Sequence, residues 1–357
     1  MKIMIGILHP KQVHSWKNII RNLENDGHEV KIVAMEKDIA LDLLDAYGFE
    51  YEVIGKNYKG LMKKAYGMLK TDIKVLKVAR KFKPDILVGG GPYLAHVSKL
   101  IGKLCITFSD TEHAKLNNWL TFPFVDVICT PSCFKRKVNP KKHVTYNGYI
   151  QLAYLHPNYF KPDSSVLDDL GLSKDDKFII LRFVSWSASH DIGQHGFING
   201  QEMVEKLKDY GSIFITSEQK LGGVLEEYRI SVPPERMHDL LYYATMYIGE
   251  GAAMASESAV LGTPAIYVNT LRLGYLDEQE KRYGLVYNFS NPKTAQKDAL
   301  AKAVELLEDE NLKNKWRKKR EKLLSDKIDV TKFMTDFIEN YPESFEKWKA
   351  NNPKEMR

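Results

Sequence analysis

The stretch MYIGEGAAMASESAVLGTPAIYVNT, residues 246–270, contains the pattern that decides the fold. An apolar run typical of a buried strand leads into small residues, a helical segment, Gly-Thr-Pro and a second apolar run. Small residues at such a turn let backbone N–H groups approach an anion, and the helix N-terminus adds about half a unit of positive charge. Glu257 follows Gly251 by six residues, and a carboxylate near that end can accept two hydrogen bonds from a ribose diol. The stretch predicts a nucleotide-binding turn. The alternative is a helix packed tightly on its sheet, with Glu257 in solvent.

The first half of the chain alternates apolar, β-branched runs with segments of helical spacing. In residues 13–27, for example, Trp16, Ile19, Ile20 and Leu23 share one helical face. This alternation predicts a parallel sheet with helices on both sides. The expected strands are residues 2–8, 29–35, 51–55, 85–91, 103–110, 125–131 and 143–149.

The alternation stops at a segment rich in Tyr and Pro and then restarts. The expected strands of the second half are residues 178–185, 212–218, 229–232, 246–250, 265–269 and 285–289, followed by a helical tail over 292–340. We therefore expect an α/β protein with two doubly wound, Rossmann-like domains facing a cleft, where ligands bind at the carboxyl ends of the strands. The expected boundaries are 1–150 for the first domain, 151–165 for a linker, 166–340 for the second domain and 341–357 for a tail.

Composition places the protein among ordinary globular chains. It has 357 residues, of which 44% are hydrophobic, which suits two domains. No apolar run approaches the roughly 20 residues of a spanning helix, and the short apolar run at the N-terminus is interpreted as a strand rather than a signal peptide. Three cysteines fit a reducing cytoplasm, and Cys129 and Cys133 lack further partners at ligand spacing, so no metal site is expected.

The charge is unevenly distributed. Residues 1–150 carry 24 Lys/Arg and 14 Asp/Glu, whereas residues 151–357 carry 28 and 32, so that net charges of +10 and −4 give the total of +6. The first half is therefore the one expected to meet an anionic surface.

A resemblance extends this interpretation. The motif GEGAAMASESAVLGTPAIYV resembles the nucleotide-sugar signature of GT-B proteins, as found in the peptidoglycan N-acetylglucosaminyltransferase that acts on lipid I and in UDP-N-acetylglucosamine 2-epimerases. The whole chain also resembles a largely archaeal family of GT-B-like proteins, through ILHPKQVHSWKNII, RFVSWSASHDIGQHG and MASESAVLGTPAIY. The resemblance implies that Gly251, Ala252, Ala253 and Ser256 lie against a diphosphate and that Glu257 holds the ribose.

One residue departs from that signature. The resembling proteins have a serine before the glycine, whereas this chain has Glu250. Because a carboxylate repels a diphosphate, Glu250 must point away, contact a cation or reflect a different substrate chemistry.

A polar loop follows the first strand of the second domain. It offers Arg182, Ser185, Ser187, Ser189, His190, Asp191 and His195. In the resembling folds this loop faces the diphosphate, so Arg182 and His190 are expected to donate to phosphate oxygens, with Asp191 orienting His190. Ser187, in the same loop, is also expected to contact the nucleotide. The alternative is a structural loop in which His190 is a cap and Arg182 pairs with an acid. A metal site in this loop is disfavoured because no fourth ligand is indicated.

The segment RISVPPERMHDLLYY, residues 229–243, resembles the part that reads the nucleobase in the same relatives. The backbone amide and carbonyl groups from Ile230 to Val232 are expected to pair with a uracil edge. The alternative is a plain strand, loop and helix.

The first domain provides the candidate catalytic residues. The G-x-G-x-x-G fingerprint is absent after the first strand, which disfavours NAD. His14 is expected to open the next helix and resembles a histidine placed after the first loop of the lipid I transferase, which implies contact with substrate or developing charge. The alternative is that it caps the helix. After a glycine loop at 89–91, Asp110 and then Glu112 are candidate general bases toward an acceptor hydroxyl, the resembling transferase having the same layout. Their alternative role is helix capping.

A basic segment lies in the same domain. Residues 56–83 hold ten Lys/Arg against one acid, Asp72, and a second cluster lies at 135–142. A basic amphipathic helix can lie on an anionic membrane, although a solvated helix packed on its sheet is the alternative. Nucleic acid is disfavoured because stacking platforms and binding motifs are not apparent.

Together these patterns and the resemblance to GT-B proteins imply a metal-independent glycosyltransferase that needs no cofactor and moves a sugar from a UDP-sugar to an acceptor, with a lipid-linked or glycan acceptor as a hypothesis. The expected location is the cytoplasm. A peripheral position at the inner face of the membrane is a further hypothesis. The alternatives are a UDP-N-acetylglucosamine 2-epimerase and a non-catalytic nucleotide-sugar or glycan binding protein.

Overall fold

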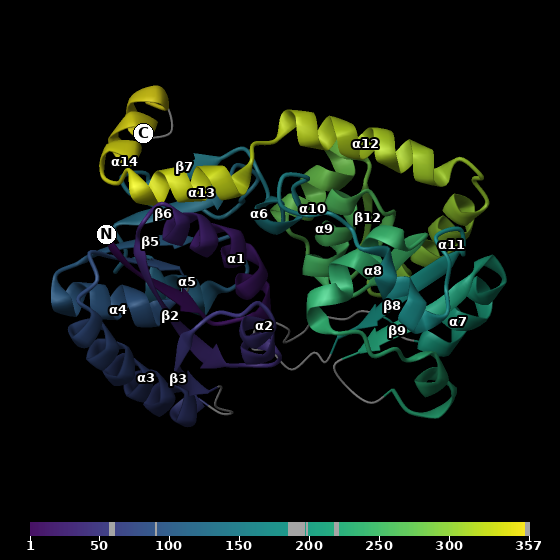
Figure 1. Cartoon of the computed structure of the whole chain (residues 1–357). Helices are drawn as coiled ribbons and strands as arrows, with labels where there is room; N and C mark the ends of the chain where they lie inside the picture. The colour runs from purple at the N-terminus through teal and green to yellow at the C-terminus, as the bar shows by residue number, and fades with distance from the viewer. Residues whose placement is uncertain (57–60, 90, 185–196, 198, 218–220, 354–357) are drawn as a thin grey trace. The chain divides into compact units, whose positions relative to one another are not determined.

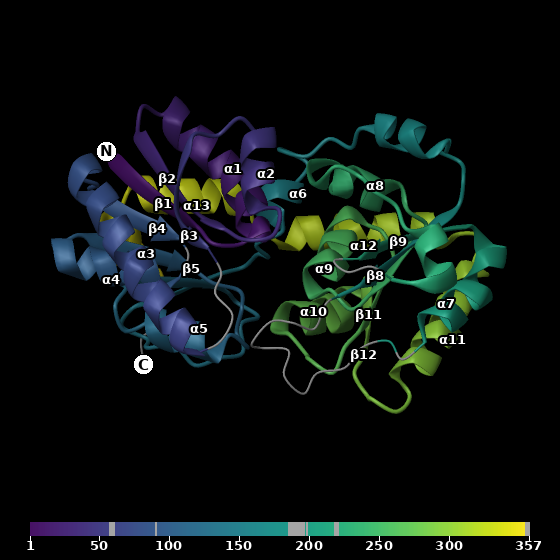
Figure 2. The ribbon, with the colours of Figure 1, turned by 90° about the horizontal axis from the view of Figure 1, so that it is seen from below.

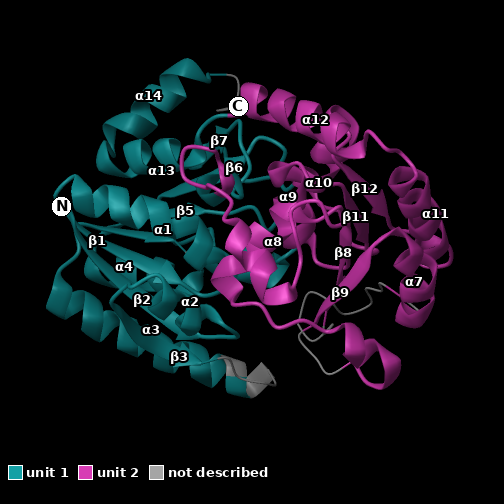
Figure 3. Ribbon diagram, turned by 45° about the vertical axis from the view of Figure 1, so that its right-hand side comes forward, with its two compact units in different colours: residues 1–154, 328–357 teal, residues 155–327 magenta. Residues whose placement is uncertain are grey.

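A computed structural model describes residues 1–56, 61–89, 91–184, 197, 199–217 and 221–353. Its contacts divide the chain into two units, each described here by itself (Figure 3). Unit 1 consists of Met1–Tyr154 and Ile328–Arg357, and unit 2 consists of Leu155–Lys327. No helix in the described ranges has both the length and the apolar character needed to cross a bilayer.

Unit 1 contains a parallel sheet of seven strands in the order β3-β2-β1-β4-β5-β6-β7. This topology confirms the parallel α/β fold predicted from the alternating sequence. The strands are β1 Lys2–Ile7, β2 Glu29–Glu36, β3 Tyr51–Lys56, β4 Ile86–Gly89, β5 Leu104–Phe108, β6 Val127–Pro131 and β7 His143–Tyr146.

Helices cover both faces of this sheet (Figures 1 and 2). On one face α1 lies beside α13, and on the other α4 contacts both α3 and α5. The predicted face of α1 is confirmed, because Trp16, Ile19, Ile20 and Leu23 are all buried. The helices of this unit are α1 Pro10–Asn25, α2 Ala40–Ala46, α3 Leu61–Phe82, α4 Pro92–Ile101, α5 Lys115–Thr121, α13 Val330–Glu339 and α14 Glu343–Asn351, with α6 Leu152–Leu155 at the junction with unit 2.

The end of the chain returns to unit 1, which differs from the expected boundary at residue 340. Val330, Met334, Phe337 and Ile338 of α13 are buried, and the hydroxyl of Thr331 donates to the carbonyl of Ala153. The helical tail itself was predicted. Its apolar stripe does not specify which of the two sheets the tail covers, because both sheets have apolar faces.

Unit 2 contains a parallel sheet of five strands in the order β12-β11-β10-β8-β9. The strands are β8 Phe178–Phe183, β9 Ser212–Ser217, β10 Met246–Gly249, β11 Ala265–Val268 and β12 Val286–Phe289. The helical elements are η1 Ser164–Leu170, α7 Gly200–Leu207, η2 Lys208–Tyr210, η3 Gly223–Tyr228, η4 Pro234–Arg236, α8 Met237–Tyr243, α9 Ala252–Leu261, α10 Gly274–Glu278, η5 Gln279–Tyr283, α11 Ala295–Leu307 and α12 Leu312–Asp326.

The strand predicted at residues 229–232 is wrong. Only a single bridge joins Arg229 to Ile215 of β9, and the chain then leaves the sheet edge. Pro233 and Pro234 follow at once, and because proline has no N–H to donate, a ladder cannot continue through them.

Candidate functional site

The turn between β10 and α9 forms the predicted small-residue entrance. Gly251 is the N-cap of α9 with φ −87° and ψ 109°, and as a glycine it has no side chain with which to cap the helix. Ala252 and Ala253 are half-buried and short. The first N–H groups of any α-helix lack intrahelical acceptors. This helix start therefore has the chemistry of an anion site, with small residues at its first positions.

The side chain of Tyr247 is hydrogen-bonded to the backbone of this turn. Its hydroxyl donates to the carbonyl of Gly251 at 3.1 Å, and a side chain at Gly249 would collide with the same hydroxyl. Burial raises the pKa of Tyr247 well above its ordinary value, so the phenol keeps the proton that it donates. The backbone at the start of α9 is thus positioned by a neutral donor.

Glu257 is buried, in contrast to the alternative that placed it in solvent. It is 5% exposed, and its Oε1 lies 3.4 Å from Nε2 of His238, which is 4% exposed. His238 comes from α8, which packs on α9. The sequence reasoning missed His238, because nothing in the spacing of two residues on different helices shows that their side chains meet.

Ser256 differs from its expected role beside a diphosphate. It is fully buried, and its hydroxyl accepts a hydrogen bond of 2.8 Å from Nε2 of Gln279, the first residue of η5. In a helix, neighbouring residues point about 100° apart, so Ser256 and Glu257 present different faces. Ser256 therefore joins α9 to η5.

The Glu250 side chain is buried and is hydrogen-bonded within the protein. Its Oε2 accepts from the backbone N–H of Val184 at 2.8 Å, and its Oε1 accepts from that of Phe197 at 2.6 Å. Asn269 also donates to the Glu250 carbonyl at 3.1 Å. The carboxylate therefore binds backbone amides rather than lying free beside the helix start. It connects Val184, the residue after β8, to Phe197.

We expect Glu250→Ala to lower the free energy of unfolding by about 2–4 kcal/mol, since two amides lose a charged acceptor. Urea unfolding measures this. The matched control is Glu205→Ala, which removes an exposed pair with Lys208 and should leave stability unchanged. Equal stability of both variants would contradict the structural role of Glu250.

The other predicted residues of unit 2 are placed as follows. Arg182 lies at the end of β8 opposite Gly249, and its Cγ would lie 3.7 Å from a Cβ at Gly251, so it is close to the start of α9. Ser187, His190 and Asp191 lie outside the described residues. The N–H of Ile230 donates to the carbonyl of Ile215 at 3.0 Å, so this amide is occupied and differs from the expected uracil contact. Val232 is half-buried.

In unit 1, Asp110 lies just past the end of β5. Its Oδ2 forms an ion pair with the ammonium of Lys11, and its Oδ1 accepts from the hydroxyl of Thr111 at 3.1 Å. Its side chain is 11% exposed and that of Lys11 is 19% exposed. The sequence reasoning missed Lys11, which lies in the first turn of α1 and whose only signal was its position shortly after the first strand.

Glu112 and His14 have structural contacts. The Oε2 of Glu112 accepts from the N–H of Lys135 at 2.7 Å, so this carboxylate holds a neighbouring loop. His14 lies inside α1, which begins at Pro10, and does not open the helix as expected. Its Nδ1 lies 2.9 Å from the Tyr47 hydroxyl, and its ring stacks on Tyr154 at 5.6 Å.

The glycine loop before α4 requires its glycines. Gly89 has φ +93°, and a Cβ there would lie 2.9 Å from the carbonyl oxygen of Gly6. Gly91 has φ +81° and is the N-cap of α4. Positive φ is strained for other residues, so these two positions let β4 turn directly into α4.

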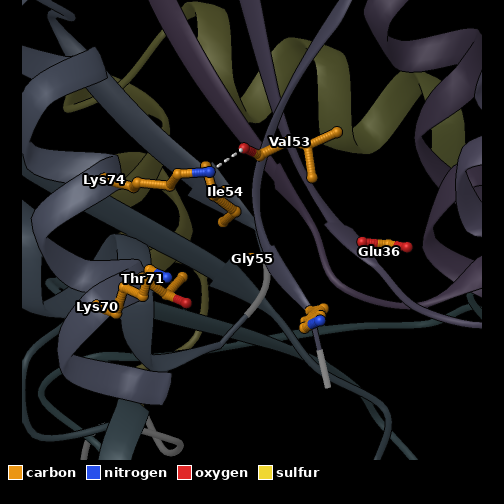
Figure 4. Close-up of a pocket in the computed structure, with 8 residues that line it drawn as sticks. Glu36, Val53, Ile54, Gly55, Lys70, Thr71 and Lys74 are labelled. Atoms are coloured by element: carbon orange, nitrogen blue, oxygen red, sulfur yellow. Dashed lines mark hydrogen bonds between the residues drawn. The ribbon is translucent and has the colours of Figure 1, made fainter. Parts of the chain in front are cut away.

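A cavity of about 160 Å³ lies elsewhere in unit 1, between β3 and α3 (Figure 4). Its lining residues are Glu36, Val53, Ile54, Gly55, Lys56, Lys70, Thr71 and Lys74. Lys74 donates to the carbonyl of Val53 at 3.3 Å. Among the described residues, none of those predicted to be catalytic or nucleotide-binding lines this cavity.

Comparisons with known proteins agree on the fold. A family model described as "Protein of unknown function (DUF354)" matches residues 1–342. Protein MJ0665 of Methanocaldococcus jannaschii is 23% identical over 279 residues, covering 74% of this chain and 81% of that protein. The UDP-N-acetylglucosamine--N-acetylmuramyl-(pentapeptide) pyrophosphoryl-undecaprenol N-acetylglucosamine transferase of Actinobacillus pleuropneumoniae serotype 5b is 25% identical over 272 residues, covering 70% of this chain and 72% of the transferase.

Among solved structures, the UDP-GlcNAc 2-epimerase of Neisseria meningitidis bound to UDP-GlcNAc has a TM-score of 0.63 at 11% identity, covering 95% of this chain and 99% of that one. This likeness confirms the predicted GT-B type of fold, with two parallel α/β units. At such low identity it shows the fold alone.

Proposed function

The chain belongs to the DUF354 family, and we propose that it is an enzyme that transfers a sugar from a UDP-sugar to an acceptor. The observation that carries the proposal is the start of α9, where a helix N-terminus opened by Gly251 and two alanines and the buried carboxylate of Glu257 occur on one short helix. The Actinobacillus relative supports it, since its name contains UDP-N-acetylglucosamine and pyrophosphoryl-undecaprenol.

In this proposal unit 2 binds the nucleotide. The N–H groups of Ala252 and Ala253 donate to the diphosphate, and Arg182 adds a positive charge beside them. Glu257 accepts hydrogen bonds from the ribose hydroxyls, and His238 holds that carboxylate in place. The donors are fixed before the substrate binds, which is the condition for electrostatic stabilisation of a leaving diphosphate.

Unit 1 presents the acceptor and its base. Asp110 takes the proton of the acceptor hydroxyl as the oxygen attacks the anomeric carbon, and the bond from that carbon to the diphosphate breaks. Lys11 orients the Asp110 carboxylate. The released negative charge is met by the helix dipole and Arg182, so the step requires no metal and no cofactor besides the nucleotide sugar. A lipid-linked sugar is the proposed acceptor class.

A second candidate is a 2-epimerase acting on the same nucleotide sugar. It is suggested by the Neisseria epimerase, which shares this fold and whose solved structure is bound to UDP-GlcNAc. An epimerase needs no acceptor, whereas a transferase releases UDP only when an acceptor is present. The two reactions are therefore separable in one assay.

The experiment incubates the protein with UDP-N-acetylglucosamine, alone and with a panel of lipid-linked and glycan acceptors. We expect UDP release only in the presence of an acceptor, and a raised Tm with UDP because a bound ligand stabilises the folded state. A new epimer without acceptor would establish the epimerase instead. A raised Tm without turnover would favour a non-catalytic binding protein, and no effect of any nucleotide on Tm would overturn all three.

A further inference from the structure

Exposed apolar side chains gather on two helices of unit 1. The large hydrophobic residues that are exposed among the described residues are Met1, Ile39, Tyr66, Leu69, Ile73, Leu100, Leu104, Leu116, Trp119, Phe124 and Val224. Three of these belong to α3, and three belong to α5 and the turn after it. Single exposed apolar residues are ordinary, but six on two segments that both contact α4, including a tryptophan that is 68% exposed, indicate an interaction surface.

The spacing places these residues on the outer face of each helix. Tyr66, Leu69 and Ile73 follow one another at three and four residues, so they lie along one side of α3, whereas Val75 and Val78 are buried against the sheet. Leu116 and Trp119 are three residues apart on α5 and are 58% and 68% exposed. Both helices therefore present large apolar groups outward.

His96 of α4 joins the two helices into one surface. Its Nδ1 lies 3.0 Å from Oδ2 of Asp72 on α3, and its Nε2 lies 3.1 Å from the carbonyl oxygen of Leu120 on α5. Its ring also meets Phe124 edge to face at 4.8 Å. Because one imidazole reaches both helices, the exposed residues of α3 and α5 belong to adjacent parts of unit 1. The figures show α3, α4 and α5 on the same side of the sheet (Figures 1 and 2).

The charge of this surface is of one sign. Helix α3 has one acidic residue, Asp72, which is turned toward His96. Its exposed basic residues are Lys63, Lys70, Lys74, Lys77, Arg80 and Lys81, and Lys115 is exposed on α5. Lysines along the border of an apolar face, with a tryptophan among the apolar groups, match the interface of an anionic bilayer, where rings enter the headgroup region and ammonium groups meet lipid phosphates.

We propose that the outer face of α3 and α5, which we call the α3–α5 face, docks unit 1 on an anionic lipid surface. The α3–α5 face consists of Tyr66, Leu69, Ile73, Leu116, Trp119 and Phe124 with the exposed basic residues just named. It binds peripherally, by inserting apolar side chains and by attraction of the lysines to lipid headgroups. This inference does not depend on the reaction that the enzyme catalyses.

The experiment is flotation of the full chain with vesicles of phosphatidylcholine, with and without phosphatidylglycerol. We expect binding to the anionic vesicles, weakened by salt, and little binding to neutral ones. Leu69→Glu combined with Trp119→Glu should lower the partition onto anionic vesicles at least about tenfold, since two apolar groups are lost and two repelling charges are added. Lys70→Glu combined with Lys77→Glu should do the same.

The matched control is Val224→Glu, which changes a residue that is 50% exposed in unit 2 and should leave flotation unchanged. A second readout is the tryptophan fluorescence, which should shift to the blue on addition of anionic vesicles in the wild type and not in Trp119→Phe. Absence of flotation with anionic vesicles would overturn the proposal. So would a concentration-dependent dimer, seen by sedimentation, that Trp119→Glu abolishes, because the α3–α5 face would then bind a second copy.

Discussion

Glu257→Ala is expected to abolish the rise in Tm caused by UDP and to weaken UDP binding by about two to four orders of magnitude. A hydrogen bond to a charged acceptor contributes about 1.5–3 kcal/mol, and a ribose diol makes two of them. Glu257 is already buried and held by His238, so binding requires little ordering of the acceptor. Titration calorimetry with UDP measures the loss, and uridine tests whether the ribose rather than the diphosphate is responsible.

The neighbouring serine provides the control. Ser256→Ala removes the hydroxyl that accepts from Gln279, so it should lower the free energy of unfolding by about 1–3 kcal/mol while UDP affinity stays unchanged. A variant that folds less stably but still binds UDP separates loss of packing from loss of the site. UDP affinity that is unaltered in Glu257→Ala would remove the nucleotide assignment on which the proposed function rests.

Asp110→Asn is expected to lower kcat by about two to four orders of magnitude, with the KM for the UDP-sugar little changed. Asparagine has nearly the same shape as aspartate but cannot take a proton from the acceptor hydroxyl, and general base catalysis contributes about that much. A drop in kcat without a change in donor binding is the signature of an interaction made in the transition state. Steady-state assays with the acceptor identified by the panel measure both constants.

Glu112→Gln is the matched control in unit 1. Its carboxylate already accepts from the N–H of Lys135, a bond that the glutamine amide oxygen can retain. We expect kcat to remain within a few-fold of the wild type. If Glu112→Gln lost activity and Asp110→Asn kept it, the base would be Glu112, and Asp110 with Lys11 would be an ion pair that only stabilises the fold.

Much of the fold was predictable because it follows from local chemistry. Apolar runs and helical spacing located every strand of the unit 1 sheet and the buried face of α1. The one strand that the structure does not contain, at 229–232, fails for a reason visible in the sequence, since Pro233 and Pro234 end any ladder there. The apolar content of a run thus indicates burial more reliably than it indicates pairing.

The candidate site was predicted in part. Gly251, Ala252 and Ala253 lie at the start of α9 as expected, because a strand followed by small residues and a helix allows few backbone paths. Ser256 faces Gln279 and Ile230 faces β9, because helix rotation and sheet contacts direct groups that a motif names only by position. Glu250 shows the same effect, since its role depends on two amides from distant parts of the chain.

The sequence by itself determined the two parallel α/β units, the small-residue start of α9 and the basic character of α3, because these depend on residues close together in the chain. Only the tertiary structure decided that His238 meets Glu257, that Lys11 meets Asp110, that α13 covers unit 1 and that Trp119 is exposed on α5. Such contacts join residues on separate elements, and their formation is decided by how the apolar faces pack, which the order of residues along one element does not specify.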